Sequence, residues 1–360
     1  MKSTIVYVFL LVLIGIGCAP GKVLKMSDTQ KVFLLDSMDA ARFITHDEAD
    51  DFFDKVNELD MSIQMKKTFE KGTSRNEMVN AYKQYLKEDV ESFTADEKKL
   101  LKKVMKKAYK DCQEFTGEIF LPEIQLLKTK GNHYGAGAYY TRENRIVIPA
   151  DAINLEGERS KSDISEALYR TMLHELFHVY SRYHPKEKRQ LYSLIGFKNI
   201  FGLPLSMDKA LEERILINPD GVDISQVIDL NTDTSTISAI PIIIANRTSF
   251  NPNTPEFFSY LKFDMYQVTR VGKAIRVISN NDGTSTIDIR QYPDFFKQIK
   301  DNTNYIIHPD EIMADNFMLA VSGAKQNAKG QDFSEEGKKL IEQVKMVLRG
   351  NFDKIDTSNQ

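Results

Sequence analysis

The sequence predicts an α+β protein, because the spacing of its apolar residues changes period several times along 360 residues. Apolar residues recur at helical spacing over 31–115, and short apolar runs typical of strands follow over 116–153. A long helical pattern then runs to Tyr183, a second strand-rich stretch covers 200–300, and helical spacing returns in 301–360. We therefore expect a small sheet with an adjoining long helix, preceded by a helical N-terminal region and interrupted by a β-rich insertion or subdomain.

Residues 1–18 have the pattern of a signal peptide that ends at Cys18. Lys2 supplies a positive charge, and Ile5–Ile16 is an apolar run too short to span a bilayer comfortably. Small residues precede Cys18, so the segment resembles a bacterial lipoprotein signal. That resemblance implies a lipid on Cys18 and a membrane-anchored protein of the bacterial cell envelope, with a polar tether over 19–30. The alternative is an ordinary signal peptide and a secreted protein.

Cys112 is the only other cysteine in the chain. If Cys18 carries a lipid, no intrachain disulfide is possible. We expect Cys112 to be a buried structural thiol in a helix.

Composition excludes some classes of function. Apolar residues make up 42% of the chain and charged residues 28%, as in ordinary globular proteins. The formal net charge of −3 gives no electrostatic reason to expect a nucleic acid as partner. The many Lys and Glu residues before position 116 most simply form solvated helix faces.

Two helix-start signatures occur in the N-terminal region 31–115. Thr45–Glu48 and Thr94–Glu97 both match the capping box, in which a Thr is followed three residues later by a Glu. The first predicts a helix that continues to about Leu59, and the second predicts a helix that begins at Ala95.

The next region, 116–199, carries strands and then a helix. Glu123–Leu127 predicts a strand, and Tyr139–Tyr140 and Arg145–Ile148 predict the two arms of a hairpin around the turn Thr141–Asn144. A strong helix is expected from Ser162 or Asp163 to about Tyr183, where the following Pro185 stops it.

The β-rich stretch 200–300 precedes a helical C-terminal part, 301–360. Asn280–Gly283 is a favourable hairpin turn, and a final amphipathic helix is expected over Ser334–Leu348, ended by Gly350. The strands predicted between 200 and 300 are Ala239–Ala245, Phe263–Thr269, Ala274–Ile278 and Thr284–Ile289.

The segment His174-Glu175-Leu176-Phe177-His178 predicts a metal site. Two His residues four apart on a helix present their imidazoles one turn apart on one face, so both reach a single ion. Glu175 is placed to accept a proton from a bound water and to deliver it to a leaving amine. This is the H-E-x-x-H pattern of zinc peptidases, and it predicts one Zn²⁺ per chain.

A catalytic zinc usually has a third protein ligand, for which two residues compete. A helix that begins at Pro309 puts Glu311 and Asp315 one turn apart, so that Glu311 would bind zinc and Asp315 would accept the free ring N–H of a ligand His. The alternative is His184, since His174 to His184 nearly fits H-E-x-x-H-x-x-G-x-x-H, with Ser181 in place of the glycine.

Together the strings HELFH at 174–178 and EIMAD at 311–315 resemble the glutamate-zincin metallopeptidases, which pair H-E-x-x-H with a later E-x-x-x-D helix. The resemblance implies a zincin-like domain and hydrolysis of peptide bonds. The segment 138–153 is similar to the strand that forms the sheet edge in such enzymes. A peptide or protein substrate is therefore expected to lie along an edge strand near Ala138–Ile148.

A peptidase also needs a donor for the developing oxyanion. Tyr305 and His308 shortly precede Glu311 and are the first candidates. Tyr180, Tyr183 and His184 are alternatives.

Two other functions fit the same residues. The chain would be a zinc-stabilised binding or scaffold lipoprotein without protease activity, with its partner surface in 200–300. Alternatively it would be a zinc hydrolase of a non-peptide amide, such as a cell-wall fragment. An intact Glu175 favours an enzyme, because a purely structural zinc site needs no general base.

Overall fold

The structure, a computed structural model, describes residues 21–355 apart from 158, 201 and 233. It combines helices with two six-stranded sheets, which confirms the α+β class. The predicted signal peptide and Cys18 lie outside the described residues. Within the described ranges, no helix is long and apolar enough to cross a bilayer.

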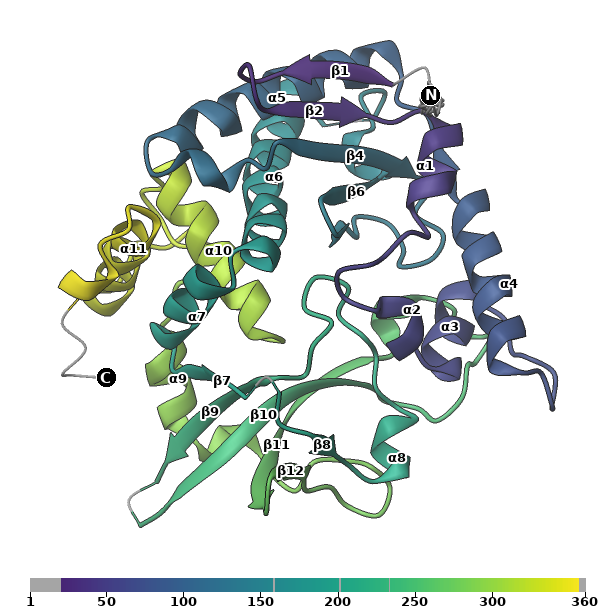
Figure 1. The fold of residues 1–360 in the computed structure, drawn as a ribbon, viewed down its shortest axis with the longest axis vertical. Coiled ribbons are helices and arrows are strands. Elements are labelled where there is room, and N and C mark those ends of the chain that lie inside the picture. Colours follow the sequence, from purple (N-terminus) through teal and green to yellow (C-terminus); the bar gives the residue numbers. More distant parts are fainter. Residues whose placement is uncertain (1–20, 158, 201, 233, 356–360) are drawn as a thin grey trace, which may run out of the picture.

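The first sheet has the strand order β1-β2-β4-β6-β5, and β3 pairs with β4 beside this path (Figure 1). Strands β2, β4 and β6 run parallel, whereas β5 is antiparallel to β6 and forms an edge. The bounds are β1 Lys22–Lys25, β2 Lys31–Leu34, β3 Val90–Glu91, β4 Glu123–Thr129, β5 Tyr140–Arg142 and β6 Arg145–Pro149.

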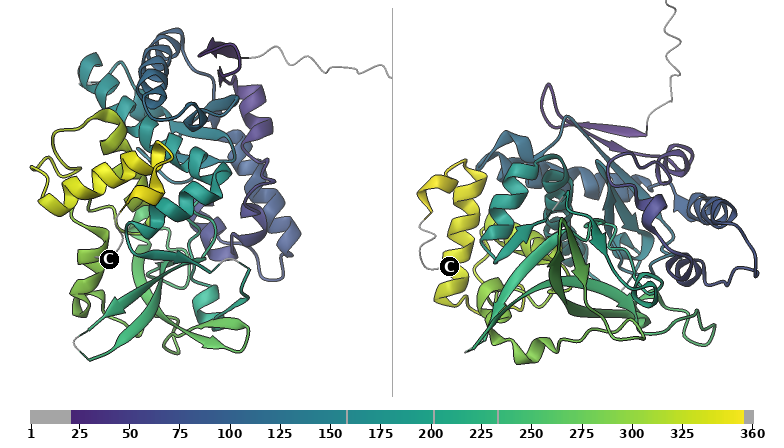
Figure 2. Two further views of the ribbon diagram at one scale, coloured as in Figure 1. Left: turned by 60° about the vertical axis from the view of Figure 1, so that its left-hand side comes forward. Right: turned by 60° about the horizontal axis from the view of Figure 1, so that its bottom comes forward.

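The second sheet is built from the β-rich stretch, in the order β7-β9-β10-β11-β12-β8. Its pairs are antiparallel except β12 with β8. Both views of Figure 2 place this sheet (green) on the opposite side of the molecule from β1 and β2 (purple). The bounds are β7 Phe197–Asn199, β8 Leu205–Ser206, β9 Gln226–Asn231, β10 Thr236–Ala245, β11 Leu261–Val271 and β12 Ala274–Val277.

Most of the helices lie around the first sheet, whereas α8 and α9 lie beside the second (Figure 1). Helix α6 packs on α5 and on β5 and β6, and α10 packs along α6 (Figure 1). The bounds are α1 Ser37–Phe43, α2 Phe52–Lys55, α3 Glu58–Met65, α4 Arg75–Glu88, α5 Ala95–Gln113, α6 Lys161–Tyr183, α7 Pro185–Ser193, α8 Lys209–Glu212, α9 Pro293–Ile299, α10 Pro309–Ser322 and α11 Glu335–Leu348.

Side-chain caps explain where the main helices begin. The Thr94 capping box opens α5 as predicted, with both reciprocal hydrogen bonds present. Ser160 caps α6, and Ser334 caps α11. His308 caps α10, and Pro309 occupies its first turn, where a missing N–H costs nothing.

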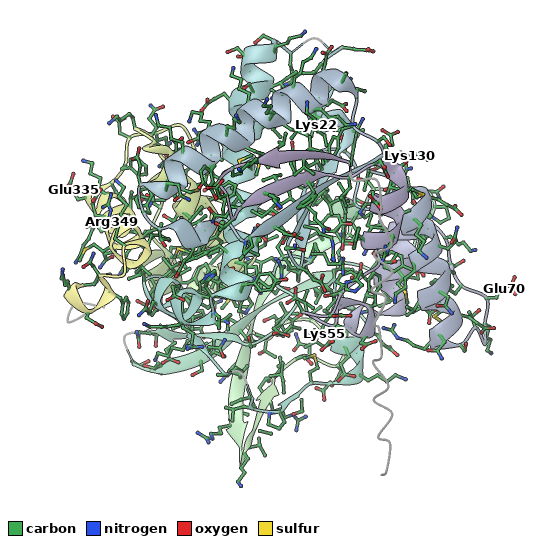
Figure 3. All side chains as sticks on the ribbon, turned by 45° about the horizontal axis from the view of Figure 1, so that its top comes forward. Lys22, Lys55, Glu70, Lys130, Glu335 and Arg349 are labelled. Carbon is green, nitrogen blue, oxygen red and sulfur yellow. The ribbon has the colours of Figure 1, made fainter. Side chains whose placement is uncertain are left out.

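The apolar interior forms two clusters, and the second sheet contributes to both. Ile228 and Met265 join the cluster around α5, α6 and α10, whereas Ile240 and Tyr266 join the cluster of α1–α4. The β-rich stretch therefore packs against the rest of the chain on both sides. Charged side chains such as Glu70, Glu335 and Arg349 are exposed at the surface, away from this interior (Figure 3). Cys112 is fully buried in α5, as predicted.

The Thr45 capping box does not open a helix, so this prediction is wrong. The Asp47 carboxylate accepts hydrogen bonds from the backbone N–H groups of Asp50 and Phe52 and forms a turn instead. Two short helices, α2 and α3, follow, and the Asn57 side chain caps the second. Asp and Asn side chains compete with helical hydrogen bonding in this way.

Three strand predictions also need correction. Thr284–Ile289 forms no strand, because the Ser285 hydroxyl bonds to the carbonyls of Met265 and Ile287 and turns the chain. The hairpin before α6 turns on two residues, Glu143 and Asn144, with Glu143 at a positive φ of 52°. Lys22–Lys25, within the expected tether, is strand β1, and the expected helical region contains β2 and β3.

A buried carboxyl, Asp60, joins the N-terminal helices to the segment that leads into the second sheet. It accepts hydrogen bonds from the Gln64 amide at 2.8 Å and from the backbone N–H of Ile217 at 2.9 Å. Burial raises the pKa of Asp60 to about 6, although both hydrogen bonds act in the opposite direction. The folded chain therefore holds this proton more tightly than the unfolded chain does.

Asp60 should make stability fall as the pH rises. Its contribution is fully present below the unfolded pKa near 3.8 and is lost as the pH passes the folded value near 6. Between pH 4 and pH 7, the free energy of unfolding of wild type should drop relative to that of Asp60→Asn by up to about 3 kcal/mol. Urea unfolding of both proteins across this range measures the difference, and a difference that does not change with pH would contradict the expectation.

Candidate metal centre

The site lies where α6 and α10 pack together. Apolar residues hold the two helices in register, and the rings of Phe177 and Phe317 lie 5.4 Å apart. His174, Glu175 and His178 come from α6, and Glu311 and Asp315 come from α10. Helical spacing places His174 and His178 on one side of α6, and Glu311 and Asp315 on one side of α10, whereas Glu175 lies next to His174 along the helix.

The structure brings His174, His178 and Glu311 together, as the sequence predicts. Each contributes a ligand atom, and these atoms all lie within 4.8 Å of one another. The Oε2 atom of Glu311 is 3.1 Å from His174 Nε2 and 3.6 Å from His178 Nε2. Ligand atoms on a tetrahedral zinc with bonds of about 2.1 Å lie about 3.4 Å apart, so the spacing fits this ion.

Asp315 orients the first imidazole. Its Oδ1 atom is 3.0 Å from His174 Nδ1, which leaves Nε2 facing Glu311. Thr303 donates its hydroxyl to the other carboxylate oxygen of Asp315. A carboxylate on Nδ1–H fixes the tautomer of a ligand His and raises its basicity.

Buried polar atoms without partners point to an ion at the same place. Among the described residues, both ring nitrogens of His178 and the Oε2 atom of Glu175 are buried and have no hydrogen-bond partner. Burial of such atoms costs free energy unless something compensates for the lost water. A cation held by His178 Nε2 would satisfy one of them, and a water beside that cation would reach Glu175.

Opposed charges perturb the ionisation of the cluster. Burial lowers the pKa of His174, but its hydrogen bonds with Asp315 and Glu311 outweigh burial and raise this pKa well above its ordinary value. Burial would raise the pKa of the Glu311 carboxyl, yet His178 and His174 lower it. Burial, followed by the Asp220 carboxylate, raises the pKa of Glu175 to about 8. In the metal-free cluster the Glu175 carboxyl therefore holds its proton more tightly than an ordinary carboxyl does.

The competing third ligand lies elsewhere. His184 ends α6, where its Nδ1 atom is 2.8 Å from the carbonyl oxygen of Tyr180 and its ring stacks on the Tyr180 ring. Its Nε2 atom lies 4.0 Å from Glu118. His184 belongs to neither of the two ligand groups found in the described ranges.

The two oxyanion candidates lie in different surroundings. Tyr305 lines the cavity of about 320 Å³ that contains His174 and Glu175, and its ring is 6.1 Å from the His174 ring. His308 is buried, and its Nδ1 atom lies 2.7 Å from Oδ2 of the Asp310 carboxylate. Of the pair, Tyr305 is the one that faces this cavity. His133 lies away from this site and is buried, with its Nδ1 atom 2.5 Å from Asp89 Oδ2.

Sequence reasoning missed Asp220, which forms a second group of possible ligands with Glu175 and His178. It lies in the loop between α8 and β9, far from both helices in the sequence. The string Asn218-Pro219-Asp220-Gly221 predicts a turn and nothing more. Only the tertiary packing brings this carboxylate to the site.

Comparison with known proteins yields no match: no family model matches the chain, and neither a curated protein nor a solved structure does. The function is therefore argued from the geometry of the site.

Zinc retention should identify the third ligand. His178→Ala and Glu311→Ala should lose the ion because each removes a converging ligand atom, whereas His184→Ala should keep about one zinc per chain. Elemental mass spectrometry on the purified variants measures this. Loss of zinc from His184→Ala together with retention in Glu311→Ala would refute the assignment.

Asp315→Asn should weaken zinc binding without abolishing it, by about 10- to 100-fold, because the amide no longer offers His174 a charged acceptor. Competition with a zinc chelator gives the affinity. Asp332→Asn, an exposed aspartate in the same C-terminal part, serves as the control and should bind zinc as wild type does. Equal affinities for all three proteins would exclude this role for Asp315.

Proposed function

We propose that this protein is a zinc-dependent metallopeptidase with a zincin-like domain, acting on peptide bonds in the bacterial cell envelope. The observation that carries the proposal is the convergence of two imidazoles and the Glu311 carboxylate at zinc-ligand spacing beside Glu175. Glu175 is buried, and its Oε2 atom has no partner among the described residues. A purely structural zinc site would not require such a carboxylate.

In this proposal His174, His178 and Glu311 hold Zn²⁺, and Asp315 keeps His174 in the required tautomer. The ion supplies Lewis acidity, which lowers the pKa of water and polarises a carbonyl. Glu175 takes a proton from the attacking water and passes it to the nitrogen of the departing amine. Tyr305, at the rim of the cavity, is placed to donate its hydroxyl to the oxyanion.

The first sheet supports a peptide as substrate. Strand β5 forms its edge, and α6 packs against β5. Ala138 and Tyr139, which lead into β5, line the same cavity as His174 and Glu175. An extended peptide that adds to this edge would bring its backbone past the ligand residues.

The proposed location follows from the N-terminus. A lipid on Cys18 would attach the chain to a membrane, and only a few residues separate Cys18 from β1. The peptidase would then act on proteins or peptides that reach the membrane surface.

Glu175→Gln should abolish peptidase activity and keep the metal. The amide preserves size but cannot accept the proton, so hydrolysis of a broad peptide library should fall by about two to four orders of magnitude. Zinc content and the unfolding transition should match wild type. Glu166→Gln, an exposed position on the same helix, is the matched control and should remain active. Full activity in Glu175→Gln would refute the proposal.

A further inference from the structure

The segment Asn218–Gly221 lies beside the cavity that we propose as the substrate site. Asp220 lines the cavity of about 320 Å³ with His174 and Glu175. It also lines a second cavity of about 380 Å³ bordered by Arg182, Lys188 and Gly221. Asp220 therefore lies between two cavities, one of which contains His174 and Glu175.

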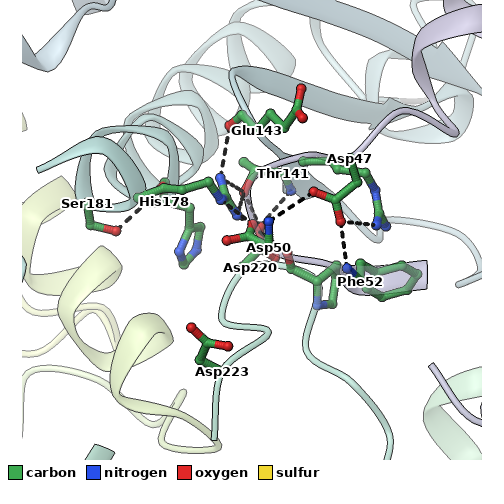
Figure 4. A network of polar contacts seen from close by, with 12 residues as sticks. Asp47, Asp50, Phe52, Thr141, Glu143, His178, Ser181, Asp220 and Asp223 are labelled. Carbon is green, nitrogen blue, oxygen red and sulfur yellow. Dashed lines mark hydrogen bonds and ion pairs between the residues drawn. The ribbon is translucent and has the colours of Figure 1, made fainter. Parts of the chain in front are cut away.

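Asp220 occupies the free edge of β5. The register pairs Tyr140 with Val147 and Arg142 with Arg145, so the N–H of Thr141 between them points away from β6. Both this N–H and the Thr141 hydroxyl donate to Asp220 Oδ1 at 2.6 Å (Figure 4). A substrate strand added at this edge would need the same backbone donor.

The Asp220 carboxylate also reaches the metal centre. One of its oxygens lies within 4.8 Å of ligand atoms of Glu175 and His178. Glu175 and His178 are buried, whereas Asp220 is half-buried and lines the cavity that contains Glu175. Figure 4 shows Asp220 beside Thr141 and Asp50, with the His178 ring close by.

Several contacts hold the segment in this position. The Asn218 amide donates to Glu311 Oε1 at 2.9 Å, and Arg182 hydrogen-bonds to Thr141 and to the Pro219 carbonyl. Gly221 lies so close to α10 that a Cβ atom there would be 2.4 Å from Asp310 Oδ2 and 2.6 Å from His308. A side chain at position 221 would therefore require either the segment or the side chains of Asp310 and His308 to shift.

From this geometry we propose that Asn218–Gly221 is an internal plug that keeps the peptidase latent, because Asp220 takes the backbone donor of β5 and lies beside His178 in place of substrate. The inference rests on the proposed peptidase function. Activation would require the segment to move away from β5. Arg182 donates hydrogen bonds both to the Pro219 carbonyl of the plug and to Asp50 in the N-terminal region. A partner or substrate that displaces the plug from these contacts would open the site.

Two variants test the plug by different routes. Asp220→Ala removes the carboxylate, and Gly221→Ala keeps it but crowds the segment against Asp310 and His308. Each should raise peptide-library cleavage by about tenfold or more. The reason is that the observed activity is proportional to the fraction of molecules whose site is open, and both variants should increase that fraction. Asp223→Ala is the matched control, because this nearby aspartate is exposed and its carboxylate forms an ion pair with Lys55 at 2.6 Å.

A second measurement does not depend on activity. Hydrogen–deuterium exchange of the Thr141 amide should become about tenfold faster or more in Asp220→Ala and stay unchanged in Asp223→Ala, because only the first variant removes its acceptor. Unchanged exchange in Asp220→Ala would overturn the plug. So would lower cleavage with zinc retained, or loss of zinc, since Asp220 would then be a catalytic group or a required ligand.

The two proposals fail in distinguishable ways. If wild type and all variants bind zinc but cleave nothing, the peptidase function is refuted. The proposal that the plug keeps the peptidase latent is then refuted as well, whatever the exchange rates are. If wild type and Asp220→Ala cleave equally well, the peptidase function stands and only the plug is refuted.

Discussion

The packing of α10 along α6 is the constraint on which the rest of the site depends. Apolar contacts such as that between Phe177 and Phe317 set the distance between the helices. The same distance determines how far the polar side chains of α6 lie from those of α10. Glu311 and Asp315 both face the His174 ring, one on each nitrogen. The ionisable side chains of two helices that are far apart in the sequence thus form one buried cluster. Burying their charges costs free energy unless the charges are paired or bound to an ion.

Local sequence signals predicted the parts of the site that lie within single helices. His174, Glu175 and His178 follow from helical spacing, and Glu311 with Asp315 follows from Pro309 at a helix start. The capping box at Thr94 likewise predicted α5, and the amphipathic spacing after Ser334 predicted α11. In each case a few neighbouring residues are enough to explain why the helix forms and where it begins, so the prediction needs no knowledge of the tertiary fold.

Features that depend on distant partners could not be predicted in this way. Asp220 reaches the site only because its loop packs against β5 and α10, and no periodicity marks it. The Thr45 signature failed because Asp47 and Asn57 offered competing hydrogen bonds. Strands β1 and β2 were missed because each has only four residues, too few to show a clear alternation of apolar and polar side chains. They are stabilised by pairing with each other and by the pairing of β2 with β4.

The order of strands in the first sheet has a consequence for orientation. β1 and β5 occupy opposite edges, four strand spacings apart, or about 19 Å at the usual separation. A chain held at Cys18 would be suspended from the β1 edge. The β5 edge would then face outward, toward whatever diffuses past the bilayer, and lipid-embedded segments would have to be drawn out of the membrane before they reached it.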